Sequence, residues 1–112
     1  MAHPSRRKGH RFEREVVDAA EAHGLEAERA FASDGRSLGC PEETDVLIRH
    51  PEANVSDCTR VQCKRRKKIA SYIFPPSGAD VTILRQDRDD SYAVVPLSDY
   101  LDLLRATADE DT

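Results

Sequence analysis

Two short segments near the middle of the chain constrain its fold more than any other feature. Residues 44–48 (Thr-Asp-Val-Leu-Ile) and 60–64 (Arg-Val-Gln-Cys-Lys) each have the apolar interior that is typical of a strand. The residues between them, 50–57, are polar and include turn formers, so the two segments predict a hairpin. Because side chains alternate along a strand, Gln62 and Lys64 should project from the same face of that hairpin.

The rest of the chain predicts further strands and helices that pack against this hairpin. An apolar stripe at the helical period predicts a first helix over residues 8–23, which Gly24 ends. A weaker strand is expected at 25–32, and a loop of turn formers at 33–43 leads into Asp45. The remaining expected elements are strands at 45–49 and 58–64, a short helix at 65–74, strands at 79–84 and 92–95, and a final helix with Ser98 as its N-cap. The predicted fold class is therefore α/β, with a mixed central sheet of about five strands flanked by helices.

Length and cysteine content limit the class of protein. A chain of 112 residues forms one domain, here 1–112, with about residues 1–6 and 107–112 expected to be disordered. The three cysteines contain no CxxC pair, which argues against a disulfide framework or a zinc site and favours a cytoplasmic protein. No apolar run is long enough to be a signal peptide or to cross a membrane. The core must be small, and association into a dimer would help to stabilise it.

Charge is distributed unevenly along the chain. The net charge of −4 taken alone argues against a nucleic-acid partner. Eleven of the seventeen Lys and Arg residues, however, gather in two clusters: Arg6, Arg7, Lys8, Arg11 and Arg14, and then Arg60, Lys64, Arg65, Arg66, Lys67 and Lys68. A local basic face matters more for phosphate binding than the total charge, so we expect these clusters to bind DNA. The alternative is that the second cluster is only a solvated face. Ser33 and Arg36, in the loop before Asp45, either bind near a DNA phosphate or belong to a flexible loop.

Four polar residues form the candidate catalytic site. Glu13 lies at the edge of the apolar stripe on the first helix, Asp45 enters one strand, and Gln62 and Lys64 lie on the next. Carboxylate and amide oxygens beside a Lys can hold a divalent cation and a water next to a phosphate. Each residue alone has an ordinary explanation as a turn, capping or surface residue. Together they form the residue set of a metal-dependent nuclease.

The same residues carry a resemblance to a known family. Arg7-Lys8-Gly9, the helix opening 12–17, the segment 44–48 and Gln62-Cys63-Lys64 resemble the archaeal-type Holliday junction resolvases of the PD-(D/E)XK nuclease superfamily. That resemblance implies a restriction-endonuclease-like core. One position departs from the pattern, because the resolvases have Glu where this chain has Gln62. The Gln-x-Lys form resembles instead the Mrr-type restriction endonucleases.

The resemblance also implies a role for each residue of the site. Asp45 would be the central metal ligand, Glu13 a second carboxylate acting directly or through water, and Gln62 a ligand through its side-chain oxygen. Lys64 would orient or activate the attacking water and stabilise negative charge at the phosphate. The implied cofactor is Mg²⁺, with Mn²⁺ as a substitute.

The predicted function is that of a metal-dependent, structure-selective endodeoxyribonuclease that makes paired symmetric nicks in four-way DNA junctions. A homodimer would supply the two active sites that a two-fold symmetric junction requires. A chain this short has no room for a separate specificity domain, which favours recognition of DNA shape. The small size also fits a phage or archaeal source. Two alternatives remain, namely an Mrr-like restriction or repair endonuclease, and a catalytically inactive junction-binding module.

Overall fold

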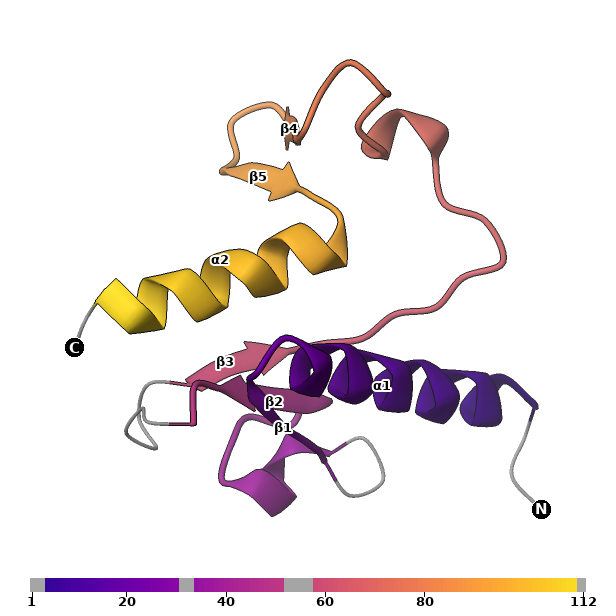
Figure 1. Cartoon of the computed structure of the whole chain (residues 1–112). Coiled ribbons are helices and arrows are strands. Elements are labelled where there is room, and N and C mark those ends of the chain that lie inside the picture. Colours follow the sequence, from indigo (N-terminus) through magenta and orange to yellow (C-terminus); the bar gives the residue numbers. More distant parts are fainter. Residues whose placement is uncertain (1–3, 31–33, 52–57, 111–112) are drawn as a thin grey trace.

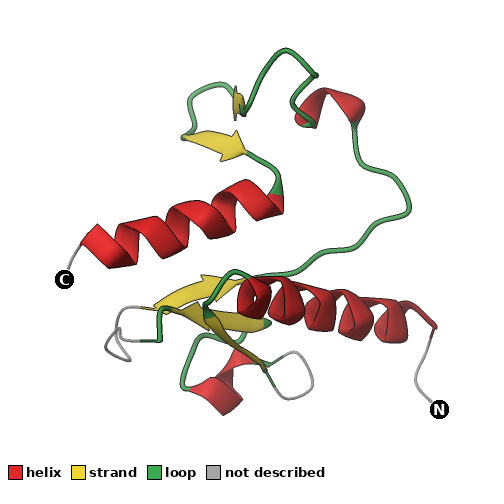
Figure 2. Cartoon of the chain, in the orientation of Figure 1, coloured by secondary structure: helices red, strands yellow, loops and turns green. Residues whose placement is uncertain are grey.

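The computed structural model describes residues 4–30, 34–51 and 58–110, with side chains for residues 8–30, 34–51 and 58–106 (Figures 1 and 2). Its elements in chain order are α1 (Pro4–Ala22), β1 (Glu26–Arg29), the 3₁₀ turn η2 (Gly35–Leu38), β2 (Val46–Arg49), β3 (Cys58–Val61), the 3₁₀ turn η3 (Ser71–Ile73), β4 (Thr82–Arg85), β5 (Ser91–Val94) and α2 (Leu97–Glu110). No helix in the described ranges is long and apolar enough to cross a membrane.

The first half of the chain forms what we call the body, residues 4–61. Its three strands make an antiparallel sheet in the order β1-β2-β3, and α1 packs against β1 and β2. Val46 and Ile48 alternate along β2 and are almost fully buried, so they face the helix. Val16 and Ala20, one turn apart on α1, are buried against them. This helix-on-sheet layer is the hydrophobic core of the molecule.

The turn between α1 and β1 has the geometry that the sequence predicts. Gly24 adopts a left-handed conformation with a φ of 80°. The amide of Gly24 donates to Glu21, and the amide of Leu25 donates to Ala20, which together form a Schellman motif. Ala20 and Leu25 also meet in the core, so the motif ends the helix and turns the chain directly into β1.

The C-terminal helix returns to the body. Leu101 of α2 is completely buried in the core. At the end of β2, His50 contacts Arg105, and His23 at the end of α1 contacts the Ser98 hydroxyl at 3.2 Å. The helix begins at Leu97, so Ser98 lies within its first turn and is not the N-cap that the sequence predicts. Leu103 of α2 is 61% exposed.

Between the body and α2 the chain departs from the sequence prediction. The expected five-stranded mixed sheet is wrong: the structure has a three-stranded and a two-stranded sheet, and both are antiparallel. The expected helix at 65–74 is also wrong, because this segment contains only η3. Five adjacent basic residues repel one another at helical spacing, and Pro75 and Pro76 cannot continue a helix. We call residues 62–68 the connector and residues 69–96 the lobe.

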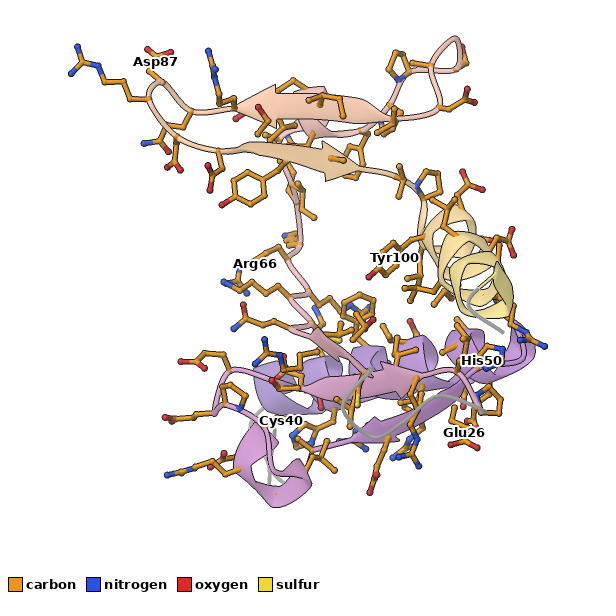
Figure 3. The ribbon with its side chains drawn as sticks, turned by 90° about the vertical axis from the view of Figure 1, so that its left-hand side faces the viewer. Glu26, Cys40, His50, Arg66, Asp87 and Tyr100 are labelled. Carbon is orange, nitrogen blue, oxygen red and sulfur yellow. The ribbon has the colours of Figure 1, made fainter. Side chains whose placement is uncertain are left out.

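The lobe stands apart from the three-stranded sheet (Figure 1). Its β4–β5 hairpin pairs only within itself among the described strands. The connector leads away from β3, with Arg66 on it, and Asp87 lies at the far turn of the hairpin (Figure 3).

The two ends of the chain also differ from the sequence prediction. Helix α1 begins at Pro4 and helix α2 continues to Glu110, in segments where the sequence predicts disorder.

Candidate functional site

Asp45 immediately precedes β2, the central strand of the three-stranded sheet. Its side chain is only 9% exposed, and its Oδ2 accepts a hydrogen bond of 2.7 Å from the backbone amide of Cys63. Its own amide donates to the carbonyl of Val61 at 2.8 Å, and its carbonyl accepts from the amide of Ala30 at 2.9 Å. Asp45 is therefore fixed from both neighbouring strands, and its carboxylate is directed toward the segment that follows β3.

Glu13 is the second carboxylate of the site. It lies on α1, is 4% exposed, and its Oε1 is 3.5 Å from Nε of Arg29 on β1. A buried carboxylate is costly without such a partner, so Arg29 compensates part of the charge of Glu13. Arg29 is not among the site residues that the sequence predicts. The available indication was the β1 alternation, because Arg29 pairs with the buried Val46 and thus occupies the inward-facing register.

The thiol of Cys63 lies near both carboxylates. Burial raises the pKa of its thiol to about 12, and the negative charges of Asp45 and Glu13 contribute to the same shift. The thiol is therefore protonated at neutral pH and lies close to both acids. Cys63 also packs against the core. That it lies next to the carboxylates was not predicted.

Gln62 and Lys64 flank Cys63 in the sequence but are more exposed to solvent than Cys63. Both are exposed, and both lie beyond Val61, where β3 ends. The expected third strand is therefore shorter than predicted, and strand alternation does not fix the directions of these two side chains. Glu13 and Asp45 are both buried and both lie near the Cys63 thiol, and Gln62 and Lys64 lie on either side of Cys63 in the exposed segment that follows β3.

A metal site cannot be recognised from acidic, His and Cys ligands alone. Nowhere in the described ranges do three or more such side chains gather so that they could hold a metal ion. That finding does not concern the amide oxygen of Gln62. Mg²⁺ commonly keeps several waters and needs only one or two carboxylates from the protein.

The loop before β2 is folded tightly against the start of that strand. Gly35 is buried, and a Cβ atom added to it would lie 2.7 Å from Cβ of Thr44. Asp34 caps η2 by accepting the amide of Arg36, and the Arg36 guanidinium also binds the Asp34 carboxylate, with Nε 3.0 Å from Oδ1. This hydrogen-bonded pair lowers the pKa of Asp34 and raises that of Arg36. The predicted DNA-binding residue Arg36 is thus paired with a carboxylate, and Ser33 lies outside the described residues.

The predicted basic clusters are located as follows. Lys8, Arg11 and Arg14 are exposed on α1. The connector residues Lys64, Arg65, Arg66, Lys67 and Lys68 are all exposed on chain without regular structure. Arg6 and Arg7 lie in the first turns of α1, and their side chains are outside those described. The connector begins next to Asp45, because the amide of Cys63 donates to the Asp45 carboxylate.

Comparison with known families shows which family the chain belongs to. Residues 4–77, about two thirds of the chain, match the sequence model of the archaeal Holliday junction resolvases (Hjc). The chain belongs to this family. The match confirms the resemblance seen in the sequence, and membership implies a nuclease, that is, a phosphodiester hydrolase, that binds Holliday junction DNA. Neither a curated protein nor a solved structure matches the chain.

Proposed function

We propose that this member of the resolvase family is a divalent-metal-dependent, structure-selective endonuclease that nicks four-way DNA junctions at two symmetric positions. The observation that carries the proposal is that two buried carboxylates from different parts of the chain, Glu13 on α1 and Asp45 just before β2, both lie near the Cys63 thiol. They lie beside the exposed segment that carries Gln62 and Lys64. Burying two carboxylates is costly without compensating positive charge, so an arrangement of this kind is typical of a site that takes up positive charge.

The donor set fits a hard divalent cation. Asp45, Glu13 and Gln62 offer only oxygen atoms, which Mg²⁺ and Mn²⁺ prefer. A cation bound there would polarise the scissile phosphate and lower the pKa of a nearby water. Asp45 would hold it through a carboxylate that the Cys63 amide already orients.

The other residues have separate tasks in this proposal. Arg29 orients Glu13 through their ion pair and limits the repulsion between the two acids. Lys64 supplies positive charge where negative charge develops on the phosphate during cleavage. The exposed basic residues of the connector bind the DNA backbone, a contact that depends on shape and not on sequence.

Symmetry requires a second protomer. A four-way junction is resolved by two nicks, and one chain of this size holds a single pair of site carboxylates. A homodimer with two-fold symmetry places two such sites at a fixed separation. We therefore include a homodimer in the proposed function.

The test is cleavage of a labelled, immobile four-way junction beside a linear duplex of the same arm sequence. Each DNA is incubated with the protein in EDTA, Mg²⁺ or Mn²⁺. We expect paired symmetric nicks in the junction alone, and only with metal. Cleavage that persists in EDTA would contradict the metal dependence, and equal cleavage of both DNAs would contradict the structure selectivity.

Gln62 favours one alternative substrate class. The Gln-x-Lys form resembles the Mrr-type endonucleases, and Gln62 contributes one less negative charge to the site than Glu. Preference for methylated linear duplex over the junction would favour this alternative. Tight junction binding without cleavage in either metal would favour an inactive binding module. In that case the variant Gln62→Glu should restore cleavage if the neutral side chain is the cause.

A further inference from the structure

The lobe exposes apolar side chains in two separate groups. Three of them lie around η3, directly after the connector: Ile69, Tyr72 and Phe74. Three others lie in the β4–β5 hairpin or next to it: Val81, Ile83 and Tyr92. From residue 62 to residue 100, all of which the structure describes, no residue is buried. Exposed apolar groups concentrated in this way mark an interaction surface.

The charge of the surrounding sequence distinguishes these two groups. Residues 58–79, which include the connector and η3, contain six basic residues and no acidic residue. Residues 80–96, which include the hairpin, contain four acidic and two basic residues. The apolar groups around η3 therefore adjoin positive charge, whereas those of the hairpin adjoin net negative charge. A polyanion such as DNA is attracted to the first group and repelled by the second.

Two aromatic rings are presented to solvent at η3, the short turn between the connector and β4 in Figure 1. Tyr72 is 77% exposed and Phe74 is 54% exposed. The amide of Ile73 donates to the carbonyl of Ala70 at 3.1 Å. The amide of Phe74 donates to the carbonyl of Ser71 at 3.2 Å. Two prolines follow, which restrict the backbone after the turn. Because this backbone is already ordered, little conformational entropy is lost when the two rings bind a partner.

Exposed rings beside a run of basic residues suit the recognition of unstacked bases. Every base has a π-face, and aromatic side chains stack on that face without reading the sequence. In a continuous duplex the neighbouring base pairs cover these faces. At a branch point the stack of base pairs is interrupted, and apolar side chains can insert there.

We propose that Tyr72 and Phe74 recognise the branch point of the DNA by stacking on base faces that are exposed there. This inference rests on the proposed function, because it names the residues that let the nuclease distinguish a branched DNA from a linear duplex. The connector binds the phosphate backbone, which the junction and the duplex share. The two rings supply a contact that only the branch offers.

The length of the connector relates this contact to the proposed site of cleavage. The chain runs from Cys63, whose amide binds the Asp45 carboxylate, to Tyr72 in nine residues. A segment of that length spans at most about 30 Å along the backbone. The same distance corresponds to about nine nucleotides of one strand in a duplex. The nicks should therefore lie within about nine nucleotides of the branch point.

The experiment measures binding of the full chain, in EDTA, to an immobile four-way junction and to a linear duplex of the same arm sequence. Tyr72→Ala and Phe74→Ala each remove one ring, and Tyr72→Phe keeps the ring but removes the hydroxyl. Tyr92→Ala is the matched control, because Tyr92 is 62% exposed but lies in the net negative hairpin. Circular dichroism confirms that each variant is folded, as expected for the replacement of exposed side chains.

We expect Tyr72→Ala and Phe74→Ala each to weaken junction binding about five- to 150-fold, which is the effect of removing one base–aromatic stack. Duplex binding should stay unchanged. Because the rings carry no charge, the slope of log K against log [salt] should stay unchanged as well. Tyr72→Phe and Tyr92→Ala should bind both DNAs like the wild type.

A fluorescent base at the branch point reports the stacking itself. Aminopurine is a fluorescent analogue of adenine whose emission falls when an aromatic ring stacks on it. We expect its emission to be lower in the saturated wild-type complex than in the saturated complexes of Tyr72→Ala and Phe74→Ala. Aminopurine placed in the middle of one arm should give equal emission in all of these complexes.

Four results would overturn the proposal. The first is that the ring variants bind the junction like the wild type, or lose affinity for the junction and the duplex equally. The second is a reduced salt slope for Tyr72→Ala, since the residue would then act by positioning the connector charges. The third is an equal loss of affinity by Tyr92→Ala, which would implicate the whole lobe surface. The fourth is a change of oligomeric state in Tyr72→Ala with unchanged aminopurine emission, which would make a protein surface the occupant of the rings.

The junction-cleavage assay separates this inference from the proposed function. Wild-type protein that quenches aminopurine at the branch point but cleaves no junction in either metal would refute the nuclease proposal and support the stacking. Paired nicks by the wild type, together with Tyr72→Ala and Phe74→Ala proteins that bind and select the junction like the wild type, would support the nuclease and refute the stacking.

Discussion

The body and the lobe differ in how each is stabilised. Seven of the eight buried apolar residues lie in the body, and the eighth, Leu101, reaches it from α2. The lobe has regular hydrogen bonding between β4 and β5 but contains no buried residue. The family match ends at residue 77, inside the lobe but before its hairpin. A strand pattern is therefore enough to form a hairpin, but a stable position for that hairpin requires something to bury its side chains.

The largest contrast should appear in catalysis. Asp45→Asn removes a proposed metal ligand from the body, while Asp87→Asn makes the same chemical change at the exposed hairpin turn of the lobe. We expect Asp45→Asn to lower the junction-cleavage rate by at least about a hundredfold, with junction binding largely intact. Asp87→Asn should leave the rate unchanged. Single-turnover cleavage and gel-shift titration on the same preparations measure both properties, and loss of binding by Asp45→Asn would argue against a ligand role.

The second contrast concerns stability. Ile48 in β2 is 1% exposed, and Ile83 in β4 is 63% exposed. Ile48→Ala should reduce the free energy of unfolding by about 2–5 kcal/mol because it leaves a cavity in the core. Ile83→Ala should change it by less than about 0.5 kcal/mol when measured on the monomer at low protein concentration. Urea unfolding followed by circular dichroism gives both values, and equal losses would mean that the lobe is packed in solution as tightly as the body.

Two glycines provide a third pair. A Cβ at Gly35 would collide with Thr44 beside Asp45, whereas a Cβ at Gly78 in the lobe would meet nothing within 4 Å. Gly35→Ala should destabilise the protein by about 1–3 kcal/mol through overpacking and should slow cleavage by displacing the start of β2. Gly78→Ala should be close to neutral. The same unfolding and cleavage assays serve here, and a neutral Gly35→Ala would show that the loop can move away from the strand without cost.

The smallest effect is expected in the salt dependence of DNA binding. Replacing Lys67 and Lys68 with Ala removes two exposed charges from the connector, and Arg85→Ala removes one exposed charge from the lobe. The slope of log K against log [salt] should decrease by about 0.9 for each phosphate contact that is lost. Arg85→Ala should keep the wild-type slope. Junction binding measured at several salt concentrations tests this, and an unchanged slope for the double variant would place the connector away from the DNA.

Local sequence predicts the body well, for identifiable physical reasons. The end of α1 at Gly24 depends on a residue that tolerates positive φ, and the strands at 46–49 and 58–61 depend on short-range patterns. Glu13 and Asp45 were predicted as site residues, and in the structure both are buried and both lie near the Cys63 thiol. The distal elements could not be predicted in the same way. Whether 82–85 and 91–94 join the first sheet depends on long-range contacts that no short window contains. The ion pair of Arg29 with Glu13 could not be predicted either, because it depends on the packing of β1 against α1.

The burial of Leu101 has a consequence for the topology of the chain. Because α2 is anchored in the core, the connector, the lobe and the start of α2 form a closed loop whose two ends both belong to the body. Closing such a loop limits the volume that the lobe can explore, and the entropy lost when it binds a partner is correspondingly smaller. A protease that cut the connector would open this loop without releasing the fragment, since the core contact of α2 would still hold the two pieces together.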